Sequence, residues 1–304
     1  MTALSKARQY VKHPARIYSF LAMRGFTDFV SDELHVRILF RAFFGYKLDL
    51  SNPKTFNEKL QWLKLYDRNR EYTVMADKLA SKAWASSRIG PQFVVPALAS
   101  WGSAEEISLD DLPDQFVLKT NHDSGGVIVC RDKASFDLSA AKRVLSKNLS
   151  RNYYWYGREW PYKDIKPTVF AERYLPTGED GDLPDFKVLC FDGIPRFIEL
   201  HRGRASHHTQ DWYDCDWNLL DMNQEYAEQS GRSYPKPDCL GEMLRLSGIL
   251  SSGVPHLRVD WFVVHGRLYL GELTFFDGSG LTSFDDPSND LLIGNYIRLP
   301  EKAM

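Results

Sequence analysis

Two carboxylates in otherwise apolar segments are the residues with the most specific chemistry. Asp260 lies within 258–264 and Glu272 within 268–274, two segments whose pattern predicts antiparallel strands joined by a short turn. A buried carboxylate is unfavourable unless it is ion-paired or bound to a cation. Carboxylates on adjacent strands can converge on one hard cation such as Mg²⁺. The alternative is a structural salt bridge in which Arg258 pairs with Glu272.

A lysine beside a glycine-rich loop is the second candidate. Lys119 ends the apolar stretch 116–119, and Gly125 and Gly126 follow in the loop 121–126. An ammonium and several backbone N–H groups around one point favour an anion such as phosphate. Glycine pairs also occur in many ordinary hairpin turns. Taken together with the acid pair, the loop indicates a site for ATP with Mg²⁺.

Other charged residues surround these two features. Glu172 precedes the end of an expected strand, and the linker after it offers free backbone groups that can hydrogen-bond adenine while Glu172 holds a ribose or amino group. Each remaining cation alone could be an ordinary surface charge. The cationic candidates for phosphate or an acidic substrate are Lys78, Lys82, Lys187, Arg202 and Arg204.

The elements that position these residues follow from hydrophobic periodicity and from glycine and proline breaks. We expect helical segments within 1–48 and helices over 51–64, 73–86, 139–149 and 240–250. We expect strands over 93–95, 116–119, 127–130, 168–174, 186–191, 196–200, 258–264 and 268–274. This mixture favours an α+β or α/β fold with at least two lobes.

Composition limits the class of protein. With 304 residues, a net charge of -2 and 43% hydrophobic residues, the chain is typical of a folded protein with a sizeable core and not of a nucleic-acid binder. It has no apolar run of membrane-spanning length and no apolar signal core, so we expect a cytoplasmic location. The basic bias before Asp28 predicts at most a weak peripheral contact with the inner face of the membrane. The four widely spaced cysteines indicate neither a zinc site nor disulfides.

Laid in order, these pieces resemble the ATP-grasp superfamily, and most closely its TupA-like branch, which is associated with teichuronopeptide, capsule and other surface-polysaccharide biosynthesis. The resemblance covers most of the chain. The motifs that carry it lie at 53–62 (PKTFNEKLQW), 76–78 (ADK), 116–126 (FVLKTNHDSGG), 185–193 (DFKVLCFDG), 258–260 (RVD) and 271–275 (GELTF).

The resemblance implies an α+β ATP-grasp fold in which two α+β lobes clasp ATP, with a helical N-terminal region. It implies an N-terminal helical region with the first subdomain over 1–114, a lid subdomain over 115–178 and a catalytic, metal-binding subdomain over 179–304.

It also implies roles for individual residues. Asp260 and Glu272 become the Mg²⁺ ligands, and Arg258, Lys187 and Arg202 become catalytic. The nucleotide-binding residues become Lys78, Lys119, His122, Ser124, Gly125, Gly126, Glu172, Leu175 and Lys187. ATP-grasp enzymes generally have Asn two residues after the second metal acid, where this chain, like the TupA-like pattern, has Thr274. Whether Asp277 compensates or lies in a turn stays open.

The activity that the resemblance implies is ATP-dependent ligation of a carboxylate to an amine through an acyl phosphate. The expected partners are a uronic acid of a sugar or polysaccharide precursor and an amino acid or small amine, or an amino-acid carboxylate and an amino sugar. His201, Arg204, His207, His208 and the aromatic run 153–156 could shape the acceptor side.

Three other functions remain open. A sugar kinase would keep the ATP site and need a base near the γ-phosphate. A carbohydrate-binding scaffold would keep the fold without turnover, which the presence of Lys119, Asp260 and Glu272 disfavours. A glycosyltransferase would need a nucleotide-sugar site with an Asp-x-Asp motif near a strand end. Asp214-Cys215-Asp216 fits these letters but falls in an expected loop rich in Trp and Tyr.

Overall fold

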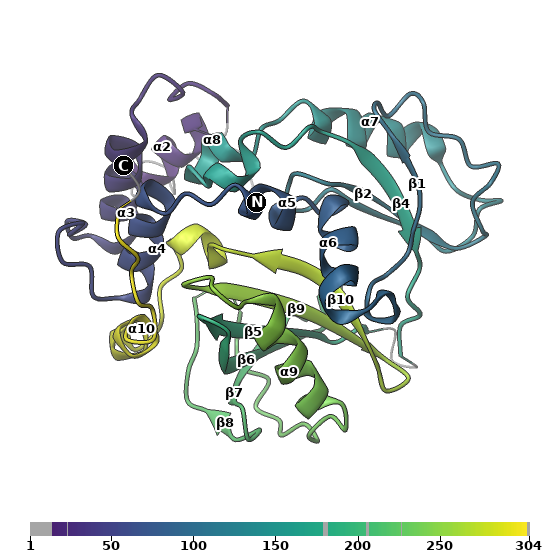
Figure 1. Cartoon of the computed structure of the whole chain (residues 1–304). Helices are drawn as coiled ribbons and strands as arrows, with labels where there is room; N and C mark the ends of the chain where they lie inside the picture. Colours follow the sequence, from purple (N-terminus) through teal and green to yellow (C-terminus); the bar gives the residue numbers. More distant parts are fainter. Residues whose placement is uncertain (1–13, 23, 179–181, 205–206, 226, 303–304) are drawn as a thin grey trace.

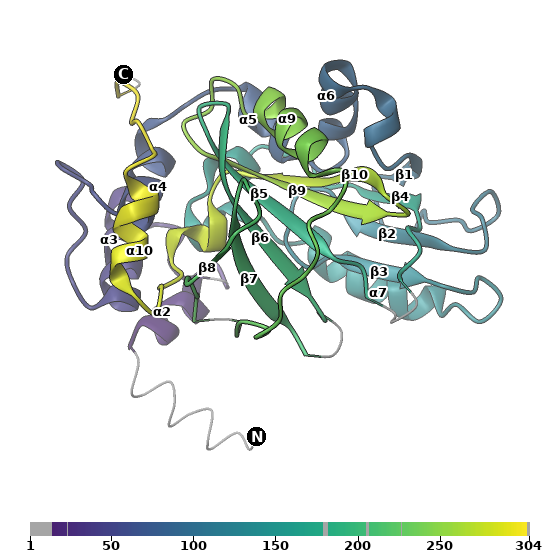
Figure 2. The same cartoon turned by 90° about the horizontal axis from the view of Figure 1, so that it is seen from below.

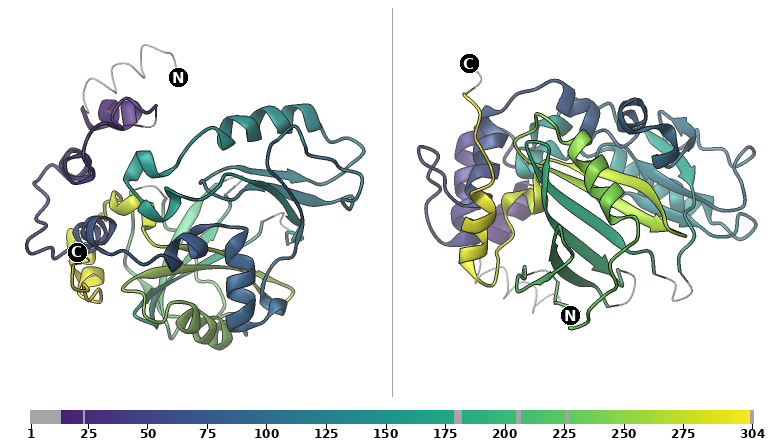
Figure 3. Two further views of the ribbon diagram at one scale, coloured as in Figure 1. Left: turned by 45° about the horizontal axis from the view of Figure 1, so that its top comes forward. Right: turned by 60° about the horizontal axis from the view of Figure 1, so that its bottom comes forward.

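The computed structural model describes residues 14–22, 24–178, 182–204, 207–225 and 227–302. Its N-terminal part is helical, as expected, with α2 (Pro14–Ala22), α3 (Asp32–Phe44) and α4 (Phe56–Tyr66). These helices lie at the opposite end of the molecule from the smaller of two sheets (Figure 3). Lys6, Arg8 and Lys12, which contribute to the basic bias, lie outside the described residues. Within the described ranges, no helix has the length and apolar character needed to cross a bilayer.

The single helix expected over 73–86 is wrong, because the chain forms two helices there. They are α5 (Glu71–Ala76) and α6 (Ala80–Ile89). The Asp77 carboxylate accepts hydrogen bonds from the backbone N–H groups of Leu79 and Ala80, at 2.8 and 3.0 Å, and so starts the second helix. Lys78 therefore lies in a break between helices.

The smaller sheet contains β1 (Ala97–Trp101), β2 (Phe116–Thr120), β3 (Val127–Cys130) and β4 (Val169–Arg173), in the order β1-β4-β2-β3, with every pair antiparallel. Helix α7 (Leu138–Leu149) packs on it and closes a separate hydrophobic core (Figure 1). The strand expected over 93–95 is wrong: Pro91–Phe93 forms a 3-10 turn, η1, and the strand begins after Pro96. The boundary predicted at 114/115 falls between two strands of this sheet.

The larger sheet has the order β10-β9-β5-β6-β7-β8 and is also antiparallel. Its strands are β5 (Asp185–Phe191), β6 (Ile194–Arg202), β7 (Thr209–Asp214), β8 (Leu219–Leu220), β9 (Leu257–Val264) and β10 (Arg267–Thr274). Helix α9 (Leu240–Leu250) covers one face, where Trp261 Nε1 donates to Ser247 Oγ at 2.8 Å. Strand β7 is not among the expected strands, and its last residue, Asp214, falls in an expected loop.

Helix α4 fastens the C-terminal segment to the body of the protein. Lys59 Nζ donates to the carbonyl oxygens of Gly294 and Ile297, at 2.8 and 2.9 Å, next to α10 (Pro287–Gly294). Gln61 Nε2 donates to Gly280 O at 2.7 Å, at the end of the turn η3 (Asp277–Gly280). Helices α4 and α10 consequently lie side by side (Figure 2). The motif at 53–62 thus supplies side chains that hold the fold together.

Candidate active site

A row of charged side chains crosses the larger sheet. Glu272, Asp260, Lys187 and Glu199 lie directly opposite one another on β10, β9, β5 and β6. Residues opposite each other in a sheet project from the same face. This charged row therefore lies on the face away from α9.

Asp260 is enclosed by cations. Arg258 donates from Nε and Nη2 to its two carboxylate oxygens, both at 2.8 Å, and Lys187 Nζ donates to Oδ2 at 2.6 Å. The Asp260 side chain is 4% exposed. Burial alone would raise its pKa, but Arg258 and then Lys187 outweigh burial and hold the pKa below its usual range. Asp260 is consequently a carboxylate at neutral pH.

Glu272 is the accessible member of the acid pair, with a side chain that is 37% exposed. Lys78 Nζ lies 3.5 Å from one of its oxygens and Arg258 Nη2 lies 3.6 Å from the other. Arg258 therefore contacts both carboxylates, so the salt bridge foreseen as an alternative is present. Two adjacent carboxylates fit Mg²⁺, which takes few protein oxygens and completes its shell with water and phosphate. Among the described residues, no group of three or more Asp, Glu, His or Cys could hold a metal by itself.

Arg258 also contacts the residues that follow β10. It pairs with Asp277, the first residue of η3, and its Nη2 donates to Thr274 Oγ1 at 3.3 Å. The Thr274 hydroxyl, at the position where Asn is usual, thus supports Arg258. Asp277 does not simply occupy a turn, because it fixes the guanidinium beside the acid pair.

The glycine-rich loop is tied to the break between α5 and α6. Lys78 Nζ donates to Asp123 O at 2.5 Å, and its backbone N–H donates to Asn121 O at 2.9 Å. Gly126 is required by space, because a Cβ there would collide with the Thr120 hydroxyl, and Gly125 has a φ of +93°. Lys78 consequently contacts both the loop and Glu272.

Lys119 and Glu172 form an ion pair on the smaller sheet, where Lys119 lies opposite Phe170 and Glu172 lies opposite Val117. Lys82 Nζ of α6 also contacts Glu172, at 2.9 Å. Burial opposes the charge of Glu172, but Lys119 and then Lys82 outweigh it and lower its pKa. The residues predicted to bind phosphate and ribose are therefore neighbours.

Other predicted residues lie less centrally. His122 is buried, with Nε2 2.9 Å from Arg151 O, while Ser124 is exposed at the loop tip and Leu175 is half-buried just after β4. Arg202 donates to Asp182 at 2.9 Å and stacks on Tyr234, so its described contacts do not bring it to Arg258 or Lys187.

Sequence reasoning did not single out Glu199 or Asp185. Glu199 is 0% exposed, and Asp185 Oδ2 lies 3.6 Å from Lys187 Nζ and 2.7 Å from Arg204 Nη2. The available signal was a polar residue at every second position of an otherwise apolar strand, as in Asp185 with Lys187 and Glu199 with His201.

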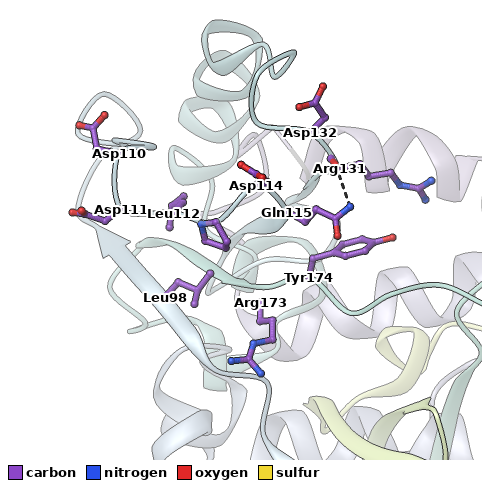
Figure 4. A pocket seen from close by; sticks show the side chains of 11 residues that line it. Leu98, Asp110, Asp111, Leu112, Asp114, Gln115, Arg131, Asp132, Arg173 and Tyr174 are labelled. Carbon is purple, nitrogen blue, oxygen red and sulfur yellow. Dashed lines mark hydrogen bonds between the residues drawn. The ribbon is translucent and has the colours of Figure 1, made fainter.

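A cavity of about 990 Å³ lies at the end of the smaller sheet away from the glycine-rich loop. Leu98, Arg131, Arg173 and Tyr174 line it together with a segment, 110–115, that carries three aspartates (Figure 4). None of the predicted site residues lines it. The aspartates would repel a triphosphate, so this cavity is not the candidate ATP site.

Asp214, the last residue of β7, caps a turn at the surface. Its carboxylate accepts hydrogen bonds from the backbone N–H groups of Asp216 and Asn218, at 2.9 and 2.8 Å. The Asp214 carboxylate is therefore occupied by the backbone of its own turn, which disfavours a nucleotide-sugar site at this Asp-Cys-Asp sequence.

Two antiparallel sheets, one with a lysine and a glycine-rich loop and the other with a carboxylate pair, define an α+β protein of the ATP-grasp class. The family model described as TupA-like ATPgrasp matches residues 58–298. The chain belongs to the TupA-like ATP-grasp family. This assignment confirms the resemblance and the predicted fold, and it supports the expected enzyme class.

The chain is also similar to several solved structures. D-alanine–D-alanine ligase from Bacillus anthracis, complexed with ATP, is 19% identical with a TM-score of 0.41 over 66% of this chain and 55% of that one. The Helicobacter pylori ligase is 17% identical (TM-score 0.44; 81% and 70% covered). A RimK domain ATP-grasp protein from Sphaerobacter thermophilus is 13% identical (TM-score 0.42; 76% and 70%). The chain thus spans about half of the Bacillus ligase. A search of curated proteins gives no match.

Proposed function

We propose that the chain is an ATP-dependent carboxylate–amine ligase that forms an amide through an acyl phosphate. The observation that carries this proposal is the contact of Arg258 and Lys187 with Asp260, next to the accessible Glu272. The arrangement places two fixed cations beside a pair of hard oxygen ligands. Phosphoryl transfer to a carboxylate brings two anions together, and fixed cations stabilise the charge that develops between them.

Each residue then has a defined task. Lys119 and Lys78 bind the phosphates, the loop 121–126 covers them, and Glu172 with the linker after β4 binds the nucleoside. Asp260 and Glu272 would hold Mg²⁺, which as a Lewis acid neutralises charge on the phosphates. Arg258 and Lys187 then hold the substrate carboxylate against the γ-phosphate, and Arg258 stabilises the oxyanion when the amine attacks the acyl carbon.

The ion pairing favours a ligase over a kinase. A carboxylate substrate is already a nucleophile, whereas a sugar hydroxyl needs a base to remove its proton. Four carboxylates beside Arg258 and Lys187 have cationic partners, Asp185, Asp260, Glu272 and Asp277. Despite burial, cations lower the pKa values of Asp260 and Glu272, so these two are weak bases for a hydroxyl.

The substrate proposal rests on the family. The association of the TupA-like branch with surface polysaccharides favours a uronic acid as the carboxylate and an amino acid or small amine as its partner. A cytoplasmic location, with a weak contact at the inner face of the membrane, belongs to the same proposal.

The test is ³¹P NMR of the protein with Mg·ATP, hexuronic acids, UDP-hexuronates and amino acids, omitting one component at a time. ADP and phosphate that form only when acid and amine are both present would support the ligase. A sugar phosphate formed without amine would establish a kinase instead. No reaction beside measurable ATP binding would direct the search to polymeric or lipid-linked acceptors.

A further inference from the structure

Amide formation requires that the amine substrate lose a proton. An amine is mainly an ammonium ion at neutral pH, and it must lose a proton before its nitrogen can attack the acyl phosphate. Burial opposes the charges of Asp260 and Glu272, but the neighbouring cations outweigh it and lower both pKa values, so these two carboxylates are weak bases. A different group is needed at the charged row.

Glu199 begins a chain of hydrogen bonds that leads away from the row. Its Oε2 lies 2.8 Å from His201 Nε2, and His201 Nδ1 lies 2.9 Å from His208 Nε2. The two imidazole rings are stacked at 24° with centroids 5.2 Å apart. Glu199 is 0% exposed and His201 is 1% exposed, so the first two members are shielded from solvent.

The outer end of this chain reaches a cavity at the edge of the larger sheet. His208 is half-exposed and lines a cavity of about 590 Å³. Glu225, Glu228 and Asp285 also line it and give it a negative charge that attracts protons and cations. This chain of hydrogen bonds consequently connects the buried Glu199, next to Lys187, with a cavity lined by three acidic side chains.

Glu199, at the inner end of this chain of hydrogen bonds, also has unusual surroundings. Glu199 Oε1 is buried and makes no hydrogen bond with another described residue, so one carboxylate oxygen is left for a donor. Burial, followed by the charge of Asp277, raises the Glu199 pKa to about 8, and burial lowers the His201 pKa. A neutral acid beside a neutral imidazole can pass a proton on, because imidazole accepts at one nitrogen while it donates from the other.

We propose that Glu199, His201 and His208 form a proton path that carries the proton of the amine substrate from the charged row to this cavity. The inference rests on the proposed function. The carboxylic proton of Glu199 passes to His201 Nε2, the Nδ1 proton of His201 passes to His208 Nε2, and His208 releases its other proton to water. The Glu199 carboxylate then takes a proton from the ammonium, whose N–H bond breaks. The freed lone pair attacks the acyl carbon, and the bond from that carbon to the phosphate oxygen breaks. The second proton on the nitrogen passes to the departing phosphate, which leaves as hydrogen phosphate.

Charged groups from several elements face this path and shift the pKa values of Glu199, His201 and His208. They are Asp185 and Lys187 on β5, Arg204 after β6, Arg258 and Asp260 on β9, and Asp277 on η3.

The first experiment needs no substrate. In the full chain labelled with ¹⁵N-histidine, NMR measures how fast the His201 imidazole N–H exchanges with water at pH 7. We expect His208→Gln, which keeps a hydrogen-bonding side chain but cannot relay a proton, to slow this exchange by more than about tenfold. His207→Gln is the matched control, because His207 lines the same cavity outside the path. Equal exchange in the wild type and in His208→Gln would overturn the proposal.

The second experiment uses the acid and the amine that the ³¹P assay identifies. We expect Glu199→Gln to slow amide formation by about 100-fold or more. Hydroxylamine, which is largely unprotonated at pH 7, should still trap the acyl phosphate at the wild-type rate. Equal losses with both nucleophiles would show a structural role only and would refute the catalytic one. If the ³¹P assay shows a sugar phosphate formed without amine while the NMR shows relayed exchange, the proposed function fails and the path stands.

Discussion

Two lysines of this protein lie almost entirely out of water, Lys64 on α4 and Lys187 on β5, with 1% and 4% exposed. Lys64 Nζ donates to Gln61 Oε1, Ser279 O and Ser279 Oγ, at 3.1, 2.7 and 3.0 Å. Lys187 instead forms ion pairs with Asp260 and Asp185. Burial lowers the Lys64 pKa to about 8 despite the charge of Glu159, whereas the two aspartates outweigh burial and raise the Lys187 pKa.

The different partners of Lys64 and Lys187 distinguish a lysine that stabilises the fold from a lysine that we propose to act in the reaction. The hydrogen-bond partners of Lys64 are neutral oxygens of fixed segments, so these hydrogen bonds contribute to the stability of the fold. The partners of Lys187 are carboxylates, and a phosphate or a substrate carboxylate can replace them without a loss of charge balance. The pKa values of these two buried lysines therefore shift in opposite directions, and we propose a role in the reaction only for Lys187.

The largest expected effect is on Asp260. Asp260→Asn keeps the shape of the side chain but removes the charge that orders Arg258 and Lys187 and would hold Mg²⁺. We expect ATP turnover to fall by about 10³-fold or more, measured as ADP release. Asp211→Asn is the control, because Asp211 is equally buried on the opposite face of the same sheet. Turnover within a few-fold of wild type in Asp260→Asn would contradict the proposed metal site.

Replacing each buried lysine by methionine tests the comparison directly. Lys64→Met leaves Ser279 O and Glu159 without their buried cation, so we expect the free energy of unfolding to fall by about 3 kcal/mol. The turnover of the protein that stays folded should not change. Lys187→Met should instead reduce turnover by about 100-fold, with a smaller loss of stability, because Arg258 still pairs with Asp260. Urea denaturation and ADP release measure the two effects, and the same pattern in both variants would refute the distinction.

The lowered pKa of Lys64 predicts a pH dependence. Its pKa falls from 10.5 to about 8 in the folded protein, so between these values the unfolded chain binds more protons than the folded one. The free energy of unfolding from this group therefore rises with pH across that window. The difference in unfolding free energy between wild type and Lys64→Met isolates the contribution. A difference that stays constant from pH 7.5 to pH 10 would show that Lys64 keeps its ordinary pKa.

Much of this fold could be predicted from the sequence. The strand pair around Asp260 and Glu272 follows from its apolar residues and central turn. The helix expected over 51–64 is present as α4, but it begins only at Phe56, where Thr55 and Glu58 form a capping box. Strand β7 could not be predicted in the same way. It is buried on both faces and carries Gln210 and Asp211 among its aromatic residues, so the expected alternation is missing.

The candidate site was less accessible to sequence reasoning. Single residues such as Asp260 stood out because a carboxylate in an apolar strand needs a partner. Their assembly into one row depends on the register of four strands, and β6 reaches the row only because it pairs with β5. The hydrogen bonds between Glu199 and His201 and between His201 and His208 depend in addition on the position of His208 just before β7, which no periodicity in the sequence specifies.

The smallest expected effect concerns the helix that carries Lys64. Thr55 Oγ accepts a hydrogen bond from Glu58 N–H, and the Glu58 carboxylate accepts one from the backbone N–H of Thr55 in return. Thr55→Ala removes the first bond and should lower the free energy of unfolding by about 1 kcal/mol, with unchanged turnover. Urea denaturation beside ADP release checks this. If turnover falls along with stability, then α4 is coupled to the site through η3, where Ser279 binds Lys64 and Asp277 binds Arg258. In that case Lys64 would affect the reaction as well as the stability of the fold.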